Sequence, residues 1–154
     1  MSADLKSFLT GWEREFAVTS RVLANFPPTS LGFRPHPKSQ TAGELAWHQA
    51  KAENHFVSAY LKQALPHPEI PASLQGMLQA YAVQHQGLCG AVRQVGETAW
   101  TRTVPLFGQD LTGAQVLELM LRHAIHHRGQ FSVYLRLVDA KVPAIYGPSA
   151  DEKA

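Results

Sequence analysis

Apolar residues recur every three or four positions in four separate stretches of the chain, and this spacing predicts four amphipathic α-helices. The stretches are residues 5–26, 41–65, 74–95 and 112–138. Pro27-Pro28 ends the first, and the Pro66-His67-Pro68 break ends the second. The second and fourth open with a threonine three residues before a Glu or Gln, which is the capping-box pattern of a helix start.

Four such helices with no convincing sheet favour an all-α, four-helix bundle around one shared core. The chain has 154 residues, of which 45% are hydrophobic, so we expect a single domain over residues 1–154. The connections between the first and second stretches (residues 27–40) and between the third and fourth (residues 96–111) are long, and they permit crossovers. An up-down-up-down order is therefore not required, and a short extended stretch is expected between Gly96 and Asp110.

Charge and cysteine content exclude several classes of protein. The net charge is only +2, and the lysines and arginines are scattered singly, so we expect no nucleic-acid partner. No apolar run approaches the roughly 20 residues of a membrane-spanning helix. Cys89 is the one cysteine, and the opening MSADLKSFLTGW lacks the pattern of a signal peptide, which favours a reducing cytoplasm.

Histidines fall at core positions of two predicted helices. His123 and His127 are four residues apart, so they lie about 40° apart on the apolar face of the last helix, and His48 lies on the apolar face of the second. This spacing suits two ligands of one divalent metal ion, and a third imidazole from a facing helix would leave a position open for water or substrate. The alternative is three separate core histidines, each with its own hydrogen bond, but that arrangement costs desolvation three times.

Other polar residues lie near these positions. His126 falls on the flank of the last helix, so we expect it at the rim of a metal site or behind the ligands. Gln130 points within about 20° of His123 and could hydrogen-bond a ligand or a substrate. His85 could line the cavity, although a hydrogen-bonded core histidine is the commoner situation.

Three more residues receive structural interpretations. Arg128 should point away from the metal and form a surface or inter-helix salt bridge. Gly129 costs roughly 1 kcal/mol inside a helix, which suggests that a neighbour packs closely against it. Cys89 is expected to be a small buried apolar residue and not a nucleophile.

Three segments together form a recognisable pattern: RPHPKSQTAGELAWH, RHAIHHRGQFSVYLRL and the tail VPAIYGPSADE. On these segments the chain resembles the DinB-like superfamily of metal-binding four-helix bundles, and the resemblance spans nearly the whole chain. It implies a divalent metal, usually zinc or nickel, on His48, His123 and His127. It also implies that His85, Gln130 and Tyr134 orient a substrate.

Several activities are compatible with that resemblance. The first is transfer of a low-molecular-weight thiol of the bacillithiol type, for which Arg34 or Lys38 could bind the carboxylates of the thiol. A mycothiol-dependent isomerase, a hydrolase that uses water activated by the metal, and a non-catalytic stress or binding protein are the others. We also expect a homodimer, with helix 1 and Trp12 at its interface.

Overall fold

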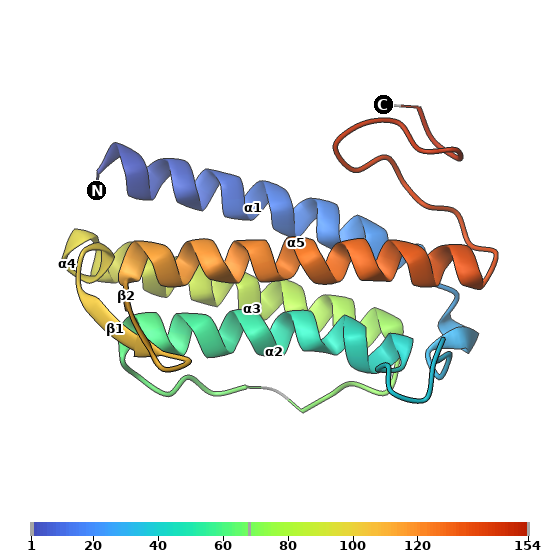
Figure 1. The fold of residues 1–154 in the computed structure, drawn as a ribbon, viewed down its shortest axis with the longest axis horizontal. Coiled ribbons are helices and arrows are strands. Elements are labelled where there is room, and N and C mark those ends of the chain that lie inside the picture. The colour runs from blue at the N-terminus through green and yellow to red at the C-terminus, as the bar shows by residue number, and fades with distance from the viewer. Residues whose placement is uncertain (1, 68, 154) are drawn as a thin grey trace.

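Four long helices dominate the computed structural model, which describes residues 2–67 and 69–153 (Figure 1). The predicted four-helix bundle is confirmed. The long helices are α1 (Ala3–Ala24), α2 (Ala42–Leu61), α3 (Leu74–Val95) and α5 (Gly113–Leu137). The short elements are the 3₁₀ turn η1 (Pro28–Ser30), the one-turn helix α4 (Glu97–Trp100) and the strands β1 (Thr103–Leu106) and β2 (Gln109–Thr112).

Both predicted capping boxes are present. The Thr41 backbone N–H donates to Glu44 Oε2 at 2.7 Å, and the Glu44 N–H donates back to Thr41 Oγ1 at 3.2 Å. Thr112 and Gln115 form the same reciprocal pair at the start of α5. The end of α2 was predicted wrongly, because Lys62 adopts a left-handed conformation with φ 55° and residues 62–65 lie outside the helix.

The helices do not alternate in direction. α1 and α5 run one way along the bundle, and α2 and α3 run the other way (Figure 1). α2 and α1 each pack against both α3 and α5, so the connections from α1 to α2 and from α3 to α5 each join diagonal helices, at opposite ends of the bundle (Figure 1). The connection that returns along the bundle contains residues 62–67 and 69–73, which we call the crossover segment (Figure 1). The helix order is therefore not up-down-up-down, and the connection that runs the length of the bundle is a different one from the two long connections that the sequence indicated as permitting crossovers.

A β-hairpin precedes α5. β1 pairs antiparallel with β2, and Leu106 faces Gln109 across the turn. Phe107 and Gly108 both have positive φ angles, 52° and 75°, as a type I′ turn requires. The expected extended stretch is thus confirmed, and it forms one arm of a two-stranded hairpin.

The core consists of two apolar clusters, one toward each end of the bundle. Buried polar side chains lie among the same helices: Thr19, Gln49, Glu53, Asn54, His85 and Arg128. Among the described residues, none of the helices is both long enough and apolar enough to cross a membrane.

Two interpretations of single residues are wrong. Trp12 is only 1% exposed inside the core, so its side chain is not available to a dimer interface. A Cβ added to Gly129 would meet nothing within 4 Å beyond its chain neighbours and the backbone of its own helix, so no other element packs closely against that glycine.

Candidate metal centre

The structure brings His48, His123 and His127 together. Their Nε2 atoms form a triangle: 3.3 Å separates His48 from His123, and 3.1 Å separates His127 from each of the other two. His48 comes from α2, and the other two come from successive turns of α5, the helix against which α2 packs. We call these side chains the three-histidine group.

The spacing of these nitrogens fits a metal ion. Two nitrogens that each lie 2.0–2.1 Å from a tetrahedral ion are separated by about 3.3 Å. Among the described residues no Asp, Glu or Cys joins the three histidines to make a larger ligand set. Three protein ligands leave at least one position for another molecule, which is typical of catalytic and not of structural sites.

The surroundings keep the imidazoles neutral. Partial burial, together with the three neighbouring imidazoles, lowers the pKa of His123 to about 4. Burial also lowers the pKa of His48, with smaller effects of His127 and Lys51, and burial lowers the pKa of His127. A neutral imidazole is the form that binds a metal, so the group is ready to do so at neutral pH.

Gln130 fixes the orientation of one of these rings. Its Oε1 lies 2.7 Å from His127 Nδ1, so Nδ1 carries the proton and Nε2 keeps its lone pair for a metal. His126, in contrast, is exposed and touches only the edge of the His127 ring, with centroids 4.9 Å apart. Of these two residues, only Gln130 makes a hydrogen bond to the group.

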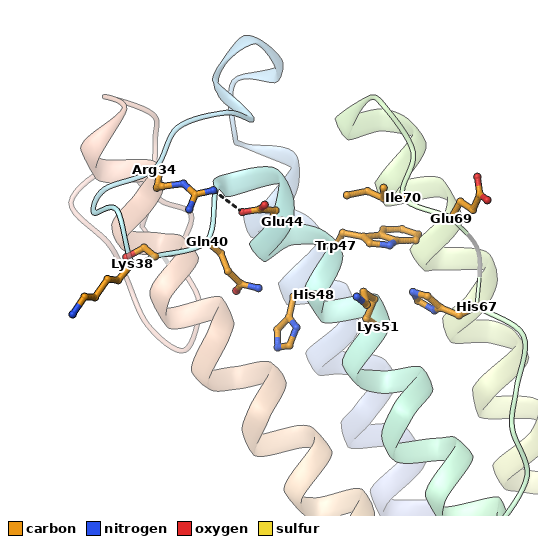
Figure 2. A pocket seen from close by; sticks show the side chains of 11 residues that line it. Arg34, Lys38, Gln40, Glu44, Trp47, His48, Lys51, His67, Glu69 and Ile70 are labelled. Carbon is orange, nitrogen blue, oxygen red and sulfur yellow. Dashed lines mark hydrogen bonds and ion pairs between the residues drawn. The ribbon is translucent and has the colours of Figure 1, made fainter.

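A cavity of about 720 Å³ adjoins His48 (Figure 2). The loop before α2, the first turns of α2 and the crossover segment form its walls, and we call it the His48 cavity. Arg34 and Lys38, proposed from the sequence as groups for carboxylates, both line it. Tyr134 contributes indirectly, because its hydroxyl donates to the backbone oxygen of Gln40, another lining residue, at 3.0 Å.

His85 is not part of this site. It is 3% exposed, and its Nδ1 donates to Glu53 Oε2 at 3.1 Å. The buried Glu53 carboxylate also accepts from Tyr81 Oη at 2.7 Å and from Trp12 Nε1 at 3.1 Å. His85 is therefore a hydrogen-bonded core histidine, and Glu53, which the sequence analysis missed, is the centre of this network.

Arg128 anchors the last helix to the first. Its side chain is 2% exposed, so it is not at the surface, and its Nη1 lies 2.6 Å from Glu15 Oε2 on α1. The Tyr146 ring of the C-terminal tail covers the guanidinium at 4.9 Å, and the Tyr146 hydroxyl donates to the same Glu15 oxygen. The predicted inter-helix salt bridge is present, and it fixes α5 next to the three-histidine group.

Cys89 is predicted to be unreactive. It is 3% exposed, and burial, followed by the charges of Glu53 and Glu13, raises the pKa of its thiol to about 12. Since only the thiolate attacks, iodoacetamide at neutral pH should alkylate the native protein at least about a hundredfold more slowly than the guanidinium-unfolded protein. Equal rates in the two states would show that the thiol is accessible and ionisable.

The sequence model of the DinB family matches residues 1–154. The chain belongs to the DinB family. Among curated relatives of this DinB-family protein, the uncharacterized protein YrdA of Bacillus subtilis strain 168 is 31% identical over 163 residues, covering all of this chain and 95% of YrdA.

Solved structures share the DinB fold. A DinB-like protein from Bacillus cereus ATCC 10987 has a TM-score of 0.83 at 24% identity, over 92% of this chain and 97% of that one. YfiT from B. subtilis, described as a probable metal-dependent hydrolase, has a TM-score of 0.70 at 16% identity, over 92% of this chain and 91% of YfiT. A mutant of the mycothiol-dependent maleylpyruvate isomerase has a TM-score of 0.64 at 17% identity, over 82% of this chain and 62% of the isomerase. At these identities the likeness concerns the fold of this DinB-family protein.

Proposed function

We propose that this protein is a metal-dependent enzyme that activates a low-molecular-weight thiol, of the bacillithiol type, for transfer to an electrophile. His48, His123 and His127 would hold a divalent metal, with zinc or nickel as the preferred ions. The observation that carries the proposal is the triangle of three neutral nitrogens, 3.1–3.3 Å apart, that no carboxylate joins.

The chemistry of the surrounding residues favours a thiol over water. When bound, the metal would supply the positive charge that deprotonates a coordinated thiol outright, so no separate base is needed. Hydrolysis of an ester or amide generally also relies on a base close to the metal. Gln130 is the residue hydrogen-bonded to the group, and its amide cannot accept a proton in that role.

The residues of the chain have separate tasks in this proposal. Gln130 holds the His127 ring so that Nε2 faces the other two nitrogens. The partial burial of the histidines lowers their pKa, so each ring is uncharged at neutral pH and keeps one nitrogen unprotonated. Lys38, on the loop over the His48 cavity, is available to a carboxylate of the thiol, whereas Arg34 on the same loop already pairs with Glu44 at 3.3 Å.

The second candidate function is a metal-dependent hydrolase. Its support is the likeness in fold to YfiT, for which that activity is described as probable. The three-histidine group would serve a hydrolase as well as a thiol transferase, because the open position on the metal accepts water as well as a thiol. The two candidates differ in whether a thiol is consumed.

The test uses tag-free protein reloaded with zinc, nickel or cobalt. Bacillithiol, cysteine and glutathione are offered with 1-chloro-2,4-dinitrobenzene, and p-nitrophenyl acetate is offered without thiol. We expect S-arylation that requires both metal and thiol, and a sulfur-to-cobalt charge-transfer band when thiol is added. Metal-dependent ester hydrolysis with no thiol effect on the cobalt spectrum would support the hydrolase, and no turnover of either kind would contradict both.

A further inference from the structure

The His48 cavity has one cationic side chain directly between two imidazoles. Lys51 follows His48 by three residues and so lies on the same face of α2, one turn further along. Figure 2 shows Lys51 between His48 and His67, and its charge contributes to lowering the pKa of both imidazoles. An exposed ammonium in this place faces whatever occupies the cavity.

Among the cations of the cavity, Arg34 has a carboxylate partner in the described residues, whereas Lys38 and Lys51 have none, and Lys51 alone of these two lies next to His48 on α2. Arg34 pairs with Glu44 at 3.3 Å, so much of its charge is already compensated. Within residues 2–67 and 69–153, no carboxylate oxygen lies within 4.0 Å of the Lys51 ammonium. The Lys51 charge is therefore available to an anionic ligand.

His67 offers an acceptor on the opposite wall. Gln84 donates its amide N–H to the Ala50 backbone oxygen at 2.7 Å, so its Oε1 faces His67 Nδ1 at 2.9 Å and that nitrogen carries the proton. His67 Nε2 is thus a lone-pair acceptor, and it is buried with no donor among the described residues. Buried acceptors are almost always paired, so a ligand or solvent donor is expected here.

The wall that carries His67 is held in place. Asn54 Nδ2 donates to the Pro66 backbone oxygen at 3.0 Å, and Ser58 Oγ accepts the Leu65 N–H at 3.2 Å. The His67 ring also lies against Trp47, with centroids 5.5 Å apart. The crossover segment therefore presents Nε2 from a fixed position.

We propose that the His48 cavity is an anion subsite, in which the Lys51 ammonium binds a carboxylate or phosphate of the substrate and His67 Nε2 accepts a hydrogen bond from an adjacent hydroxyl or amide N–H. The anion subsite begins at His48, one member of the three-histidine group, so the bound molecule would place its reacting group there. That last connection rests on the proposed function, whereas anion binding by Lys51 and His67 requires no metal.

The test is calorimetric titration of the protein, as purified and after chelator treatment, with malate, succinate and inorganic phosphate. Malate and succinate are both dicarboxylates, but only malate has a hydroxyl. We expect malate to bind more tightly than succinate. Lys51→Met should weaken the binding of malate and of succinate about tenfold each, since one charge-assisted contact is lost. Lys62→Met, which removes the same charge from the end of α2 outside the cavity, should have no effect.

His67→Phe supplies the second readout. This variant keeps an aromatic ring beside Trp47 and removes the acceptor, so its affinity for malate should fall to its affinity for succinate. The ratio of malate to phosphate affinity tells whether a carboxylate or a phosphate is the better anion. No binding of any probe, equal losses in the two lysine variants, or a malate preference that survives His67→Phe would each overturn the proposal. Because the chelated protein is titrated too, failure of the metal chemistry would leave this result readable.

Discussion

Replacing His127 or His48 with alanine should abolish stoichiometric metal binding, while replacing His126 should leave it intact. Wild-type protein reloaded with zinc or nickel is expected to hold about one equivalent of the ion. Each alanine variant of the three-histidine group leaves only two nitrogens, and these do not make a three-ligand site. Mass-spectrometric metal analysis of dialysed, tag-free protein measures the outcome.

His126 is the matched control for His127. It is the neighbouring residue, it is an imidazole, and it is exposed with only an edge contact to the His127 ring. His126→Ala therefore removes a histidine from the same turn of α5 without removing a nitrogen from the triangle. Metal loss in this variant, or metal retention in His127→Ala, would contradict the assignment of the ligands.

Gln130→Ala should give an intermediate result. The variant keeps all three nitrogens but frees the His127 ring, whose Nδ1 loses its 2.7 Å partner. Loss of such a supporting hydrogen bond typically lowers metal affinity roughly 10–100-fold. Competition with a chromophoric chelator measures the metal affinity and distinguishes the intermediate loss in Gln130→Ala from the larger loss in His127→Ala. Circular dichroism verifies that all the variants are folded.

The sequence identifies the three histidines because helical periodicity puts each of them on the apolar face of its own helix. His123 and His127 are one turn apart on the apolar face of α5, and His48 is on the face of α2 that packs against it. Which helices are neighbours is not encoded in that periodicity. The resemblance to a known family, and then the fold, supplied this information.

Residues that depend on loops and on helix order were harder to predict. His67 lies in a Pro-flanked segment with no period, so nothing in the sequence indicates that it returns along α2 to face Lys51. Glu53 and His85 are partners only because α2 and α3 are parallel neighbours. Lys51 is the exception, since its spacing of three residues from His48 could have indicated a shared face.

Adding one methyl group at Gly113 should destabilise the protein strongly. Gly113 is the first residue of α5, and its N–H donates to the Arg102 backbone oxygen at 2.9 Å. A Cβ there would lie 1.9 Å from the Ala99 backbone oxygen and 2.9 Å from Tyr60 Cε2. Ala99 is fully buried, so relief requires moving the backbone of α4 and not the rotation of a side chain.

The expected cost of Gly113→Ala is about 3 kcal/mol, the upper end of the range for overpacking. For a domain of this size that corresponds to a fall of about 6–12 °C in the melting temperature. Gly129→Ala is the matched control, because it adds the same methyl within the same helix, where no other part of the structure lies within 4 Å of it.

The control should change stability in the opposite direction, because alanine favours the helix over glycine by about 1 kcal/mol. Gly129→Ala should therefore melt about 2–4 °C above the wild type. Thermal unfolding of the metal-free proteins compares the three chains without the stabilisation that a bound ion adds. If Gly113→Ala melted at or above the wild-type temperature, the close approach of α4 to the start of α5 would be wrong, and with it the placement of the hairpin that leads into the helix carrying His123 and His127.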